Sequence, residues 1–439
     1  MHAAGGSDWS NGAKQSNARI ALARYNKPLA DESSVKHNSP WLFGFLGIPN
    51  GLANAIIVIL MPYVLRRQGV AVDRIAEIVA LASLPNVWYF LYSPVVDLGL
   101  RRRTWILFAA FIAGLCAALA VLSSGGSLTV LTILLFTSGA VGSLISSANG
   151  ALLSFLEPAV RGRASGWYQA GNLGGGTVGG GVAIWLADRV NLPWLALGVV
   201  LLIFLPATAA VLIEEVAPHR RAVIPVFADL FHDLRNVLWS RRTLIGMLFF
   251  LSPVGSAAVA NLASGLGPDY HAPAGEVMWI SGIAGGLLSA LGSLVGGYVC
   301  DRMNRMRAYA LSGGLSALFA IYLAFAPATP WTYGLGYSGY SLAAGFAYAV
   351  FTALVLEVLG RRRHAAGTAY SLFVATGNVP ILYMTWLDGV GYKFGAVRGL
   401  MTVDALANGL GAVVLLLIAR SALRYFRESE AAEAAVASP

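Results

Sequence analysis

The chain has 439 residues, of which 57% are hydrophobic and only 12% are charged, with a mean hydropathy of +0.67. Soluble domains carry about 25% charged residues, so this composition excludes an ordinary water-soluble protein and predicts that most of the surface faces a lipid bilayer. The net charge of +9 does not indicate nucleic-acid binding, because the basic residues stand in short clusters between apolar segments.

Apolar segments of about twenty residues, the length of a membrane-spanning helix, recur along the whole chain. We predict an all-α membrane protein with twelve transmembrane helices in two pseudo-symmetric six-helix bundles. The helices are expected at residues 42–65, 75–96, 104–122, 128–155, 164–187, 192–214, 243–266, 275–299, 307–327, 331–357, 366–388 and 399–420.

A polar linker separates the two predicted bundles. Its residues Val226, Leu230, Leu234 and Leu238 recur every four positions, which predicts an amphipathic helix on the inner membrane surface. The expected divisions are a polar cytoplasmic tail at 1–40, a first six-helix half at 41–214, the linker at 215–242, a second half at 243–421 and a cytoplasmic tail at 422–439.

The placement of Lys and Arg predicts the orientation, because short loops rich in these residues stay in the cytoplasm. With both termini inside, most of the 30 basic residues fall in the tails and inner loops. The basic residues that remain outside are Arg66, Arg67, Arg74, Arg189, Lys393 and Arg398.

Two inner loops repeat one pattern at matching places in the two halves. Asp97 is followed by Arg101, Arg102 and Arg103, and about 200 residues later Asp301 begins a second loop with several arginines. Such a repeat indicates an internally duplicated transporter.

These loops, Asp-x-x-x-Arg-Arg-Arg after helix two and Asp-Arg-x-Asn-Arg-x-Arg after helix eight, resemble those of the major facilitator superfamily. The superfamily usually has Gly three residues after the Asp. Here Leu100 and Asn304 stand at those places, and Asn tolerates left-handed backbone better than most residues. The resemblance covers about residues 41–425 and implies transport by alternating access.

Within the superfamily, residues 47–52, 65–70, 84–85 and 90–97 resemble the branch of AmpG-like muropeptide permeases and of acetyl-coenzyme A or siderophore importers. Two positions depart from that branch. Tyr89 stands where Lys is frequent, and Gly171-Asn172-Leu173 stands where Gly-Tyr-Arg is frequent. The cavity is therefore expected to lack the basic residues that would hold an anionic ligand.

The charged loops predict two cytoplasmic gates. A carboxylate beside the N-terminus of a neighbouring helix meets unpaired N–H groups and the positive end of the helix dipole, so it can hold the two halves together. The alternative is that these charges only set topology and form weak surface salt bridges. The predicted gating residues are Asp97, Arg101, Arg102, Glu157, Arg163, Asp301, Arg305, Glu357 and Arg361.

Polar and aromatic residues inside the helices are the candidates for substrate binding. Amides in hydrocarbon are costly, so they should face a wet cavity or another helix. Interhelical hydrogen bonding and interfacial aromatic residues are the alternative. The predicted substrate-binding residues are Asn50, Asn54, Asn86, Tyr89, Trp167, Tyr168, Asn172, Asn261, Tyr337, Tyr340 and Asn378.

Asp388 and Asp404 are the candidates for proton coupling. Their positions in the outer parts of helices eleven and twelve favour an alternative, in which both face an outward aqueous vestibule. No clustered His, Asp, Glu or Cys residues predict a catalytic site, a metal site or a cofactor.

We therefore expect a bacterial inner-membrane transporter, monomeric, for a muropeptide-like, sugar-containing metabolite, with protons as a further partner and no nucleic acid. The alternatives are an acetyl-coenzyme A or siderophore transporter of the same branch, a membrane-embedded acyltransferase, or a non-transporting membrane sensor. An acyltransferase would need converging catalytic residues, and a sensor would lose the matched gates; the sequence has no such cluster and keeps both gates.

Overall fold

The computed structural model describes residues 38–97, 100–215, 241–360 and 366–437. Every regular element within these ranges is helical. The amphipathic helix predicted in the linker lies outside the described residues, as does Arg361.

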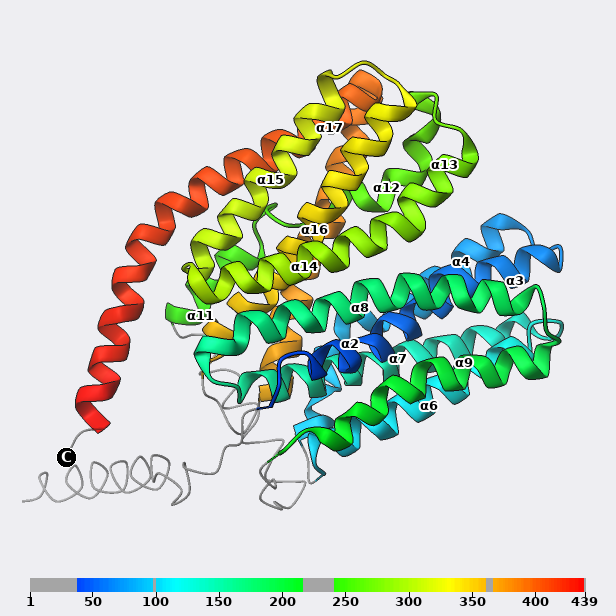
Figure 1. Cartoon of the computed structure of the whole chain (residues 1–439), viewed down its shortest axis with the longest axis horizontal. Helices are drawn as coiled ribbons and strands as arrows, with labels where there is room; N and C mark the ends of the chain where they lie inside the picture. The colour runs from blue at the N-terminus through cyan, green and yellow to red at the C-terminus, as the bar shows by residue number, and fades with distance from the viewer. Residues whose placement is uncertain (1–37, 98–99, 216–240, 361–365, 438–439) are drawn as a thin grey trace, which may run out of the picture. The chain divides into compact units, whose positions relative to one another are not determined.

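The first half of the chain forms six spans between residues 42 and 212 (Figure 1). Their elements are α2 (Leu42–Ala55), η2 (Ile56–Leu60), α3 (Met61–Arg67), α4 (Val72–Ser83), α5 (Pro85–Trp88), η3 (Tyr89–Leu91), η4 (Ser93–Asp97), α6 (Arg102–Leu122), α7 (Leu128–Ser154), α8 (Pro158–Ala187), α9 (Leu192–Ala207) and η5 (Thr208–Leu212).

The second half forms six more spans from residue 241 onward. Their elements are α11 (Arg241–Phe250), α12 (Ala258–Leu266), η6 (Gly267–Tyr270), α13 (Ala274–Met278), η7 (Trp279–Ala284), α14 (Gly285–Arg302), α15 (Arg305–Phe325), α16 (Pro330–Leu359) and α17 (Ala366–Ala437). The last of these contains two spans, because Gly395 and Ala396 leave helical geometry and turn the chain back on itself.

Eight helical runs of the described chain are long and apolar enough to cross a membrane, and one of them is the double span of α17. Three further spans fall short of that measure for separate reasons. The glycines of α8 lower its hydropathy, while the second and seventh spans are interrupted. The structure therefore has the predicted all-α architecture of twelve spans in two six-helix bundles.

The interruptions differ from the continuous helices that the sequence predicts. In the second span, Pro85 begins a new short helix and Pro94 lies in a 3₁₀ turn, because proline cannot donate the backbone hydrogen bond that a continuous helix needs. In the seventh span, α11 and α12 are separated by residues 251–257, which include Pro253 and Gly255.

Helix α8 packs closely against α2 in its own half and against α14 of the other half (Figure 1). A Cβ at Gly171 would collide with the carbonyl oxygen of Gly44, and a Cβ at Gly162 would collide with the Asp301 carboxylate and the carbonyl of Gly297. Small residues let membrane helices approach this closely. The glycines of α8 thus place the two halves in direct contact.

Candidate functional site: a polar cavity and two latches

A cavity of about 300 Å³ lies between the two halves. The second span (α5 and η3) and helices α2, α7 and α8 line it from the first half, and the interrupted seventh span, α15, α16 and α17 line it from the second. Its lining mixes polar and apolar side chains and carries no Asp, Glu, Lys, Arg or His among the described residues. An uncharged, hydrogen-bonding cavity suits a neutral polar group on the ligand.

Seven of the predicted substrate-binding residues line this cavity. They are Asn50, Asn54, Asn86, Tyr89, Tyr168, Asn172 and Asn378. The lining also includes residues that the sequence interpretation missed, among them Ser143, Ser146, Gln169, Ser256, Tyr309, Tyr348 and Tyr370.

A chain of amide side chains crosses the cavity wall from one half to the other. Asn50 donates to Asn172 at 3.1 Å, and Asn172 donates to Gln169 at 3.1 Å. Gln169 then donates to the hydroxyl of Thr352 in α16 at 2.8 Å. Each of these amides therefore has a hydrogen-bond partner, as buried polar groups require. Asn50, Asn172 and Gln169 also line the cavity.

Two buried hydroxyls of the cavity lining make no hydrogen bond of normal geometry among the described residues. They are the Tyr89 Oη of the first half, which has the hydroxyls of Ser146 and Ser371 as neighbours, and the Ser256 Oγ of the second half. An unpaired buried hydroxyl costs about 1–3 kcal/mol. A polar ligand or water in the cavity would supply the missing partners, so these two atoms mark where a ligand hydroxyl or amide is best bound.

The remaining predicted substrate residues lie elsewhere. Tyr337 and Tyr340 are buried in the core of the second half, packed with Tyr270 and Tyr333, and so do not reach the cavity. Trp167 is exposed on α8. The backbone of Asn261 lies in α12, and its side chain is outside the described part of the structure.

The first latch joins Asp97 to the N-terminus of α17. One carboxylate oxygen accepts from the Gly367 N–H at 3.3 Å, and the other accepts from the N–H and the hydroxyl of Thr368 at 3.0 and 2.9 Å. The Asp97 carboxylate is buried, and the Arg102 guanidinium lies 3.6 Å from it. Helix N–H groups and a cation together offset the cost of burying this carboxylate.

Arg102 of this latch is also buried and has a second acidic partner that the sequence interpretation missed. Glu215, after the sixth span, accepts from the Arg102 backbone N–H at 3.0 Å and from its guanidinium at 3.3 Å. Its second oxygen accepts from the Arg103 N–H at 3.2 Å. Glu215 therefore caps the N-terminus of α6 and also binds the guanidinium of Arg102, the cation of the first latch.

The second latch joins Asp301 to the N-terminal part of α8. Its oxygens accept from the Gly162 N–H at 2.9 Å, from the Arg163 N–H at 3.2 Å and from the Arg163 Nε at 2.7 Å. Arg305 contacts Glu357 at 3.2 Å and donates to the carbonyl of Pro158 in the first half at 2.6 Å. Both latches thus use a carboxylate against a helix N-terminus of the opposite half.

Three other arginine and glutamate residues near the latches differ in their surroundings. Arg161, which is buried, donates to the carbonyl of Leu356 in the other half at 3.3 Å, a contact that the sequence interpretation missed. Arg101 is exposed and takes no part in the latch contacts of the described chain, and Glu157 is exposed at the start of α8. Between latches and cavity, Ser147 and Ser371 join the halves at 3.0 Å.

Asp388 and Asp404 are both fully buried in the second half, so the expectation that they face an aqueous vestibule is wrong. Tyr340 donates to both oxygens of Asp404 at 3.2 Å, and Asn408 donates to one of them at 3.1 Å. Asp388 has no hydrogen-bond partner among the described residues. The two acids belong to the interior of one half, away from the cavity lining.

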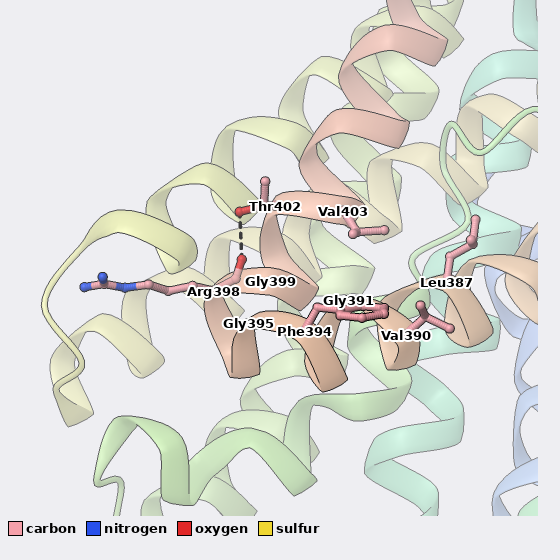
Figure 2. Close-up of a pocket in the computed structure, with 9 residues that line it drawn as sticks. All are labelled: Leu387, Val390, Gly391, Phe394, Gly395, Arg398, Gly399, Thr402 and Val403. Carbon is pink, nitrogen blue, oxygen red and sulfur yellow. Dashed lines mark hydrogen bonds between the residues drawn. The ribbon is translucent and has the colours of Figure 1, made fainter.

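A second, larger hollow lies where the last two spans meet. Figure 2 shows its apolar lining, including Leu387, Val390 and Val403, with Arg398 extending away from these side chains. The volume is about 560 Å³. Because its lining offers almost no hydrogen-bonding side chain and comes from α17 alone, this hollow fits contact with lipid chains better than selective binding of a polar ligand.

Two bundles that enclose a polar cavity and are latched at one end define a membrane transporter rather than an enzyme. The sequence pattern of the Major Facilitator Superfamily matches residues 43–385, and the chain belongs to that family. It is 26% identical, over 80% of its length and 74% of the relative's, to the anhydromuropeptide permease of Escherichia coli K12.

Solved structures of the same family share the fold. The human organic anion transporter MFSD10 superposes with a TM-score of 0.65 at 15% identity, covering 85% of this chain and 98% of the transporter. The Escherichia coli transporter FucP in its outward conformation gives 0.64 at 16% identity, covering 86% and 97%. At these identities the likeness concerns the fold alone.

Proposed function

We propose that this protein carries a muropeptide-like, sugar-containing metabolite across the bacterial inner membrane by alternating access, with the central cavity as its binding site. The observation that carries this proposal is the uncharged lining of amides, hydroxyls and tyrosines, which includes the unpaired hydroxyls of Tyr89 and Ser256. Sugars need hydrogen bonds around their rim and flat apolar surface against their rings, and this lining offers both.

The 26% identity to an anhydromuropeptide permease supports the same choice of ligand. An acetyl-coenzyme A transporter is the second candidate, from the resemblance of the first helices. Coenzyme A carries several phosphate charges, and burying these without cationic partners is costly. The described residues of the lining provide no cation, and a volume of about 300 Å³ is at the lower end of ligand pockets. Both features favour a small sugar moiety over coenzyme A.

We further propose that the Asp97 and Asp301 latches form the cytoplasmic gate, with both termini in the cytoplasm, and that residues 41–214 and 243–421 rock against each other as a monomeric unit. The concentration of Lys and Arg in the loops on the latch side supports this orientation. Asp388 and Asp404 are the proposed proton-coupling groups, because they are the acids buried in the interior of the second half.

A thermal-shift measurement on the purified protein tests the choice of substrate, since a ligand that binds only the folded state raises its melting temperature. The panel contains an anhydro-N-acetylmuramyl disaccharide, its peptide-bearing form, acetyl-coenzyme A, a siderophore and glucose. A shift with the anhydro-sugars is expected. A shift with acetyl-coenzyme A or the siderophore alone would overturn the proposed substrate class, and so would no shift with any compound.

The position of the ligand is tested with Tyr89→Phe, which keeps the ring and removes the unpaired hydroxyl. Loss of one ligand hydrogen bond is expected to weaken binding about three- to tenfold. Tyr392→Phe is the matched control, because Tyr392 bonds Asp269 at the surface and does not line the cavity. Equal affinity of both variants would exclude Tyr89 from the site.

A further inference from the structure

The interrupted seventh span forms part of the cavity wall. Val254, Gly255 and Ser256 of the break line the cavity. Gly255 has φ +73° and Ala257 has φ +53°, and the left-handed conformation costs an L-residue such as alanine about 1–2 kcal/mol. A strained break beside a ligand site persists only where neighbouring groups hold it in place.

Three side chains from other spans hold the free backbone groups of this break. Tyr309 donates to the carbonyl of Val254 at 2.7 Å, and Tyr383 donates to the carbonyl of Leu251 at 2.8 Å. The Gly255 N–H donates to the side-chain oxygen of Asn408 at 3.3 Å. Broken backbone at membrane depth needs such partners, so these tethers set the shape of the cavity wall.

Among the described residues, the tether through Asn408 is the one that leads on to an acid. The amide nitrogen of Asn408, which is fully buried, donates to the Asp404 carboxylate and to the Asp404 carbonyl, each at 3.1 Å. Asn408 therefore touches the cavity wall with its oxygen and the buried acid with its nitrogen.

The surroundings of the two acids decide where a charge can reside. Tyr337 and Tyr340 of α16 face the two acids, and Tyr270 of η6 packs beside these tyrosines. No Lys, Arg or His of the described chain forms an ion pair with Asp388 or Asp404. Two unpaired negative charges in such an interior are prohibitively costly. Asp404 has two donors and Asp388 has none, so a single charge belongs on Asp404.

We propose that Asn408 is a positioning residue that couples the protonation of Asp404 to the shape of the cavity wall at Gly255 and Ser256. This inference rests on the proposed role of Asp404 in proton coupling. When Asp404 is charged, its bond to Asn408 is charge-assisted and fixes the amide, which in turn fixes the Gly255 N–H. When Asp404 gains a proton, that bond weakens, the amide loosens, and the strained break becomes free to move.

Hydrogen–deuterium exchange of residues 251–257 tests this coupling without any substrate. The protein is placed in lipid nanodiscs at several pH values, and exchange is corrected for the intrinsic effect of pH. Local opening of the break is expected to increase about fivefold as Asp404 becomes protonated, because a charge-assisted hydrogen bond is stronger than a neutral one. Asp404→Asn should exchange at the faster rate at every pH.

Asn408→Ala is expected to abolish the pH dependence while the break exchanges fast throughout, and Asn408→Gln should restore part of it. Tyr309→Phe is the matched control: it removes a tether of the same break that has no link to the acids, so exchange should rise while the pH dependence remains. If Asp404→Asn does not fold, the Asn408→Ala and Tyr309→Phe pair still decides the question.

A pH dependence that survives in Asn408→Ala would overturn the proposal, as would one that is absent from the wild type. The outcome is separate from the question of the substrate. If the anhydro-sugars fail to bind but the break responds to pH through Asn408, the coupling stands and only the choice of ligand falls.

Discussion

The two latches use the same chemistry in different surroundings. Asp97 has a side-chain exposure of 0%, and its partner Arg102 has 8% and is also bound by Glu215. Asp301 has 9%, and its partner Arg163 is half exposed at 50%. Partly exposed ion pairs are weak because water competes for both charges, whereas breaking a buried pair leaves a charge without solvent. The two halves are thus expected to be held mainly by the Asp97 latch.

The largest effect is expected for Asp97→Asn. The substitution keeps the shape but removes the charge from three hydrogen bonds and from Arg102, and hydrogen bonds to charged groups contribute about 1.5–3 kcal/mol. The open state should become at least about tenfold more populated. Cys300 is buried against Gly162 where α14 meets α8, so its labelling rate by a maleimide in a Cys116→Ser background measures this opening.

A second thiol is introduced by Ser147→Cys, at the position where Ser147 contacts Ser371 of the other half. Labelling at both thiols distinguishes separation of the two halves from local loosening around one latch. Both thiols should react faster in Asp97→Asn. An unchanged rate at both positions would mean that the Asp97 latch does not hold the inner side closed.

An intermediate effect is expected for Glu215→Gln, because it weakens the second acidic contact of Arg102 and leaves Asp97 in place. Labelling of both thiols should rise several-fold. The double variant with Asp97→Asn should show less than the sum of the two effects, since both changes act on the same arginine. Strict additivity would show that Glu215 acts only as a cap of α6.

A smaller effect, about two- to fivefold, is expected for Asp301→Asn, because Arg163 can return to water at little cost. The decisive reading is the labelling rate of the thiol at position 147, which lies beside Gly367 of the Asp97 latch. If that thiol reacts faster in Asp301→Asn than in Asp97→Asn, the order of the two latches is the reverse of the one argued from burial.

The smallest effect is expected for Arg101→Ala. This arginine belongs to the predicted gating set, yet its side chain is exposed beside the buried Arg102. Labelling at both thiols should match the parent protein. A clear increase would indicate that Arg101 contributes to the latch through a contact that is absent from the described residues.

The contacts of the two latch carboxylates were predictable because their chemistry is local: Asp97 and Asp301 stand at span ends next to arginines, and a helix N-terminus is the partner that such an end favours. Glu215 was not predictable, because nothing in its own segment signals that it would return to the start of α6. The same holds for Arg161, whose carbonyl partner in α16 lies in the other half.

The cavity shows where sequence reasoning ends. Asn50 and Asn172 line it, whereas Tyr337 and Tyr340, with equally suitable side chains, pack inside the second half. A helix that is apolar on all sides gives no signal of which face meets the cavity, another helix or lipid. Asp388 and Asp404 illustrate the same point. Their positions along the spans predicted contact with water, whereas the packing of the second half buries both side chains.

The sequence by itself determined the membrane class, the twelve spans and the two charged loops, because hydropathy, span length and charge clustering act along the chain. Only the tertiary structure decided which polar residues share a cavity, where the seventh span breaks and which latch is buried. Those outcomes depend on contacts between spans that are far apart in the sequence. A small rotation of a helix about its axis decides whether a given side chain faces the cavity or the packed core.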